Sequence, residues 1–135
     1  MTLIPAASAS ILLAGILATG ASAQAPRADP IGAEKHHRAA VEYFDKAQKD
    51  TTLTLDQKRD AIQRGIAAEG RALALDPNSI VALVYKNILL RMLAVNARDG
   101  QERENLIRQA DALGKRVLAL QAGHPERDFL RMGGA

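Results

Sequence analysis

The sequence lacks or is poor in several residue types, and each shortage excludes a class of protein. It contains no cysteine, which rules out a disulfide scaffold, a cysteine zinc site, a thiol nucleophile and a lipidated N-terminal cysteine. It has only two tyrosines and two phenylalanines, which are few for a β-sandwich, because such folds rely on aromatic and β-branched strands. Neither a disulfide-rich protein nor a β-sandwich is therefore expected.

Charge is missing from the beginning of the chain. The first 26 residues contain no Lys, Arg, Asp or Glu, so all 18 basic and 15 acidic residues follow. Within this stretch, residues 11–18 (ILLAGILA) are apolar, and Ala21-Ser22-Ala23 follows shortly after. A short apolar run that ends in small residues is typical of a secretory signal peptide. We predict a signal peptide over residues 1–23 and export to the periplasm or the extracellular space.

The apolar run is much shorter than the roughly 20 residues that span a bilayer, so no permanent membrane anchor is expected. Residues 1–10 lack the usual basic residue, which leaves an uncleaved anchor or a misassigned start codon as alternatives. Residues 24–30, with Pro26 and Pro30, are predicted to be a disordered lead-in. The formal net charge is only +3, and no Lys/Arg block exceeds two residues. Nucleic-acid binding is therefore not expected.

Proline is scarce beyond the lead-in, and this scarcity favours long helices. Pro77 is the only proline between Ile31 and His124, so two proline-free blocks remain, each long enough for a helical hairpin. Apolar residues recur at helical spacing in both blocks. The sequence predicts four helices, over residues 31–49, 55–75, 80–95 and 101–122.

The helix ends carry recognisable signals. Thr54 and Gln57 match a capping box at the start of the second helix. Pro77 stops that helix, and Asn78 or Ser79 can cap the third one. The third helix is polar only at Lys86, Asn87 and Arg91, so it should lie in the middle of the structure. On the surface, Asp111 and Lys115 are one of several expected ion pairs at i,i+4.

The second and fourth predicted helices are related by an internal repeat. A shift of 45 residues places residues 71–75 (RALAL) on residues 116–120 (RVLAL), and Gly65 on Ala110. A repeat that contains one helical hairpin indicates a helical-repeat architecture.

Residues 72–79 (ALALDPNS) resemble the end of a tetratricopeptide repeat (TPR), in which Asp-Pro-Asn closes the second helix. Gly65 fits the small position of that helix, and Leu83 matches the first large apolar position of the next one. Residues 82–91 resemble an exported bacterial variant of the family with long helices. The resemblance implies an all-α domain of two antiparallel TPR-like hairpins over residues 31–125, followed by a frayed tail at 126–135.

Two features of this domain leave alternatives open. The repeat of about 45 residues is longer than the family's usual 34, so a closed four-helix bundle is the alternative arrangement. Asn87 and Arg91 lie on one face of the third helix, where they either bond a neighbouring helix or a carboxylate such as Glu69, or face a groove and bind a partner. With Val84 and Lys86, they are the candidate binding residues.

No pattern in the sequence indicates catalysis, a metal or a cofactor. His36 and His37 are adjacent, so on a helix they point about 100° apart, and we expect them to be exposed rather than to share an ion. No phosphate-binding loop or nucleophile motif is present. The sequence predicts an exported, non-catalytic scaffold that binds a protein or peptide. The alternative is an assembly subunit of the cell envelope that self-associates, for example as a homodimer.

Overall fold

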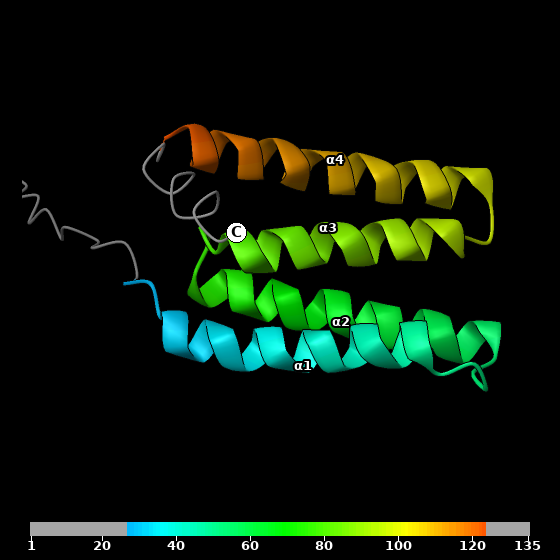
Figure 1. Ribbon diagram of the computed structural model, residues 1–135. Helices are drawn as coiled ribbons and strands as arrows, with labels where there is room; N and C mark the ends of the chain where they lie inside the picture. Colours follow the sequence, from blue (N-terminus) through cyan, green and yellow to red (C-terminus); the bar gives the residue numbers. More distant parts are fainter. Residues whose placement is uncertain (1–26, 124–135) are drawn as a thin grey trace, which may run out of the picture.

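A computed structural model describes residues 27–123, which form four α-helices and no strand (Figure 1). The helices are α1 (Pro30–Lys49), α2 (Leu55–Leu75), α3 (Ile80–Val95) and α4 (Gly100–Ala122). The predicted all-α fold is confirmed, and every predicted helix boundary lies within one residue of the observed one. The predicted signal peptide at 1–23 and the predicted tail at 126–135 lie outside the described residues.

Each helix begins at a side chain that accepts a hydrogen bond from an otherwise unpaired backbone N–H. The predicted capping box of α2 is present, with Thr54 Oγ1 accepting from Gln57 N and Gln57 Oε1 accepting from Thr54 N. The other three caps are Asp29 for α1, Ser79 for α3 and Asp99 for α4.

The structure places the start of α1 within the last residues of the predicted lead-in. Pro30 is the first residue of α1, and the Asp29 amide donates to the Leu75 carbonyl at 2.9 Å. Proline suits this position because its missing N–H would be unpaired in any helix. Asp29 and Pro30 therefore belong to the helical domain rather than to a separate lead-in, and residues 24–26 of the predicted lead-in lie outside the described residues.

The four helices form an open row of two hairpins (Figure 1). α1 packs on α2 and α3 packs on α4, and the two hairpins meet mainly where α2 contacts α3. Within residues 27–123, α1 and α4 make no extensive contact and lie at opposite ends of the row. The alternative of a closed four-helix bundle is wrong, because a bundle requires its first and last helices to pack together.

The core is centred on α3, as its apolar sequence predicts. Leu83 and Leu89 of α3 have no exposed surface, and neither does Ile62 of α2. A β-carbon on Gly65 would lie 3.1 Å from Leu89 Cδ1 and 3.4 Å from Tyr43 Cβ. Gly65 therefore allows α1, α2 and α3 to approach closely. None of the four described helices has the length and hydrophobicity needed to cross a membrane.

Candidate functional site: an apolar face on α3 and α4

Exposed apolar side chains are concentrated on the second hairpin. Eight large hydrophobic residues are exposed among those that the structure describes, and six of them lie on α3 and α4. We call these six the α3–α4 face: Val81, Val84, Ile88, Val95, Ile107 and Leu118. A cluster of exposed apolar side chains on one hairpin is a feature of interaction surfaces, whereas scattered single residues need no explanation.

The members from α3 lie along a single stripe. Val81, Val84, Ile88, Arg91 and Val95 are separated by three, four, three and four residues, and all five are exposed. This spacing places them on one side of the helix. α3 therefore buries its remaining sides against its neighbours and presents this stripe to solvent.

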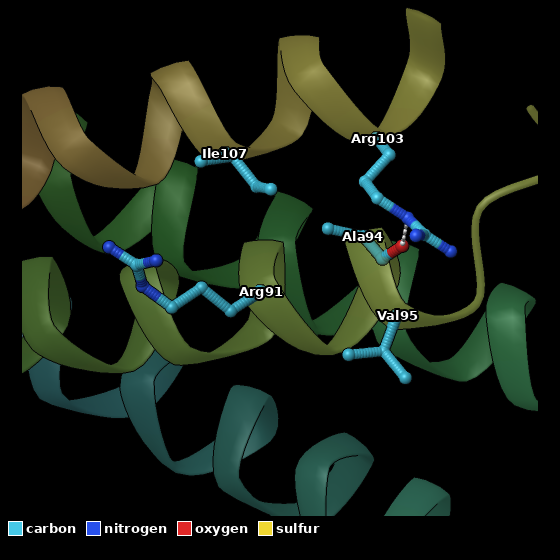
Figure 2. Close-up of a pocket in the computed structure, with 5 residues that line it drawn as sticks. All are labelled: Arg91, Ala94, Val95, Arg103 and Ile107. Atoms are coloured by element: carbon cyan, nitrogen blue, oxygen red, sulfur yellow. Dashed lines mark hydrogen bonds between the residues drawn. The ribbon is translucent and has the colours of Figure 1, made fainter. Parts of the chain in front are cut away.

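A first hollow lies where the C-terminal part of α3 meets the N-terminal part of α4 (Figure 2). It has a volume of about 350 Å³. Arg103 extends from α4 toward α3, and its Nε donates to the Ala94 carbonyl at 3.3 Å. The other lining residues are Arg91, Val95 and Ile107. The hollow thus combines apolar walls with two guanidinium groups.

A second hollow, of about 310 Å³, lies toward the other end of the same hairpin. Gly114 contributes to it, and a β-carbon there would lie only 3.3 Å from Asn87 Nδ2. The absence of a side chain at Gly114 lets Asn87 reach α4. The remaining lining residues are apolar: Val84, Ile88, Val117 and Leu118.

A chain of hydrogen bonds crosses from α3 to α4 between the two hollows. Asn87 Nδ2 donates to the Ala110 carbonyl at 2.6 Å, and Asn87 Oδ1 accepts from Arg91 Nε at 2.9 Å. Arg91 also donates to Asp111 Oδ1 at 2.6 Å, with both side chains about half exposed. Asn87 and Arg91 therefore fix the register of the hairpin, and Arg91 remains exposed at the surface.

The structure brings three of the four predicted binding residues together. Val84 and Asn87 line the second hollow, and Arg91 lines the first. Lys86 is separate, because it lies on the side of α3 that faces α2, where a β-carbon on Gly70 would be 3.8 Å from its Nζ.

The expectation that Asn87 and Arg91 bond a neighbouring helix or a carboxylate is confirmed, but the carboxylate is Asp111 of α4 and not Glu69. Both side chains bond to α4, at Ala110 and Asp111. Asp111 consequently pairs with Arg91 across the two helices and makes no ion pair with Lys115 among the described residues.

Glu69 belongs to a second polar site, which lies inside the helix row and was missed by sequence reasoning. Its side chain has no exposed surface, and its Oε1 lies 2.8 Å from His37 Nδ1 on α1. Its Oε2 has no hydrogen-bond partner. The Tyr85 ring of α3 meets the imidazole edge-on at 4.9 Å. The expectation that His37 is exposed is wrong, since only 14% of its side-chain surface is accessible.

Burial raises the pKa of Glu69 to about 6, because the charged carboxylate loses its hydration. The hydrogen bond and charge of His37, followed by the charge of Lys86, act in the opposite direction. Sequence did offer one signal for this site. Glu69 falls on the repeating apolar face of α2, where a carboxylate needs a buried partner.

A third buried polar group, Arg59 on α2, connects the two hairpins. It is 5% exposed, and it donates to the Asn96 carbonyl and, at 2.5 Å, to Glu102 Oε1. Its bonds hold the α3–α4 loop against α2. Within residues 27–123, no group of three or more potential metal ligands comes together.

Comparisons of this chain with models of protein families, with curated proteins and with solved structures gave no match.

Proposed function

We propose that this protein is an exported, non-catalytic helical-repeat protein of the TPR type that binds another protein or a peptide through the α3–α4 face. The observation that carries the proposal is the concentration of six exposed apolar side chains on one hairpin. Exposing them to water is unfavourable, and covering them with a partner removes that cost.

The composition of the face also suits an interface. Protein interfaces combine an apolar centre with arginine and a polar rim. Here Ile88, Val95 and Leu118 supply apolar surface, and Arg91 and Arg103 lie beside them. The predicted signal peptide at 1–23 would place this face in the periplasm or outside the cell.

Site-specific photo-crosslinking tests the proposal. A photoreactive residue at position 88 lies within the second hollow, whereas one at position 55 lies on α2, which also exposes a large apolar side chain there. In cells that express the full chain, the residue at 88 should give discrete cross-linked products that the residue at 55 does not give. Identical products at both positions would contradict the proposal.

The same experiment addresses the alternative function. The exposed α3–α4 face could also be covered by a second copy of the chain, as a self-associating envelope subunit requires. In that case the product at position 88 has twice the mass of one chain and contains only its peptides. Light scattering on the purified protein measures its oligomeric state independently.

A further inference from the structure

We infer that the α3–α4 face binds an amphipathic α-helix of a partner protein, whose apolar side chains recur every three and four residues and which carries an acidic side chain opposite Arg103. This inference rests on the proposed function, and it specifies the kind of partner. Three independent observations support it.

The first is the shape of the face. The two hollows lie between antiparallel helices, one bounded by Val84 and Ile88 and the other by Arg91 and Val95. Val84 of the second hollow and Arg91 of the first are seven positions apart, as are Ile88 and Val95. Seven residues correspond to roughly 10 Å along a helix. Side chains at i and i+7 of a bound helix have the same separation, so one helix can fill both hollows.

The second observation is the internal repeat. The shift of 45 residues places the α2 residues Ile62, Gly65 and Ala72 on the α4 residues Ile107, Ala110 and Val117.

These α2 residues form the surface of the first hairpin on which α3 packs. Ile62 belongs to the same apolar cluster as Leu89 of α3, Ala72 clusters with Ala82 of α3, and Gly65 faces Leu89. α4 thus repeats the surface on which α2 packs a helix. Ala110 is already buried against the core, whereas Ile107 is exposed and Val117 lines an open hollow. A helix is therefore the occupant that this surface matches.

The third observation is charge. Of the two arginines at the first hollow, Arg91 is paired with Asp111. Arg103 bonds only the neutral Ala94 carbonyl and has no carboxylate within ion-pair distance among residues 27–123. An acidic side chain on the partner would complete a charge-assisted pair with Arg103. The α3–α4 face of a second copy carries the same arginines, so it complements the charge of Arg103 less well than an acidic partner helix does.

The probes are fluorescent synthetic peptides, helix-forming and about five turns long, with leucines spaced three and four residues apart. One carries a central Glu and the other a Lys at the same position. Their binding to the full chain is measured by fluorescence anisotropy. We expect the Glu peptide to bind at least about tenfold more tightly than the Lys peptide, and Arg103→Glu to reverse that preference.

Two variants locate the binding surface. Ile88→Asp should weaken binding of the Glu peptide at least about tenfold, whereas the control Leu55→Asp, at an exposed apolar residue of α2, should leave it unchanged. Both variants are compared by circular dichroism, so that a loss of folding is distinguished from a loss of binding.

The possible failures are distinguishable. Absence of peptide binding, with cross-linking at position 88 retained, overturns the helix inference and leaves the proposed function standing. Equal affinity for both peptides overturns the acidic requirement. Chain dimerisation that competes with the peptides assigns the face to a second copy, and this also overturns the inference. Loss of both binding and cross-linking overturns the proposed function as well.

Discussion

His37 Nδ1 on α1 lies 2.8 Å from Oε1 of Glu69 on α2, a carboxylate with no exposed surface. The contact joins residues 32 positions apart at the point where Tyr85 of α3 also packs. Three helices therefore meet around one buried ionisable group. Its other oxygen has no partner, so the charged form of Glu69 is incompletely compensated.

This arrangement predicts a pH-dependent stability. The pKa of Glu69 is raised from 4.5 to about 6. The contribution of protonated Glu69 to the free energy of unfolding is therefore fully present below pH 4.5 and is lost as the pH rises through about 6. His37, Lys86 and Glu34 are the charged neighbours that tune this pKa. Relative to Glu69→Gln, the unfolding free energy of the wild type should fall by about 2 kcal/mol from pH 4 to pH 7.

Urea unfolding of both proteins at a series of pH values measures this difference. Glutamine is the matched control, because it has nearly the same shape as the protonated carboxyl but does not titrate. Stability profiles that run parallel over this pH range would show that Glu69 does not carry the effect.

Arg59 should be required for the attachment of the second hairpin. Arg59→Ala removes the donors to the Asn96 carbonyl and to Glu102, and it should cost about 1–3 kcal/mol of stability. Arg64→Ala is the control, because Arg64 is an exposed arginine of the same helix and its ion pair with Asp60 is also exposed. Denaturant unfolding should show a clear loss for Arg59→Ala and little change for Arg64→Ala. Equal losses would mean that the buried bonds of Arg59 contribute nothing specific.

Asn87 and Arg91 should differ in their effects although they are bonded to each other. Asn87→Ala leaves the Ala110 carbonyl without its side-chain donor, so it should cost about 1–3 kcal/mol. Arg91 and Asp111 are both about half exposed, so water can replace their bond, and Arg91→Ala should cost less than about 1 kcal/mol. Thermal melts of the two variants make the comparison, and a larger loss for Arg91→Ala would reverse our assignment.

Leu83 tests the location of the core. It has no exposed surface, and Leu83→Ala should cost about 2–5 kcal/mol, because it removes buried apolar atoms and leaves a cavity. Lys115 is exposed on α4, so Lys115→Ala should cost less than about 1 kcal/mol. Similar unfolding midpoints for the two variants would place the core elsewhere.

The helix boundaries were predictable because their signals are local. The capping box at Thr54 and the proline at position 77 act within four residues of the ends that they determine. The burial of α3 was predictable as well, since its composition leaves few polar positions.

The polar contacts were less predictable, because their partners are distant in sequence. Glu69 pairs with His37 at a separation of 32 residues, and Arg59 pairs with Glu102 at a separation of 43. Periodicity identifies the face on which such a residue lies, but it does not identify the residue on the opposing helix. Asp111 illustrates the same limit, because Arg91 of the neighbouring helix replaces the local partner Lys115.

The open row has a consequence for the way in which the molecule comes apart. α4 packs extensively only on α3, and Leu106 and Ala110 are its only buried residues. Detaching α4 therefore exposes far less apolar surface than unfolding α3, which contacts every other helix. The amide hydrogens of α4 should exchange with solvent sooner than those of α3, through a partial opening that leaves the first hairpin intact. Hydrogen exchange resolved by residue would detect this order.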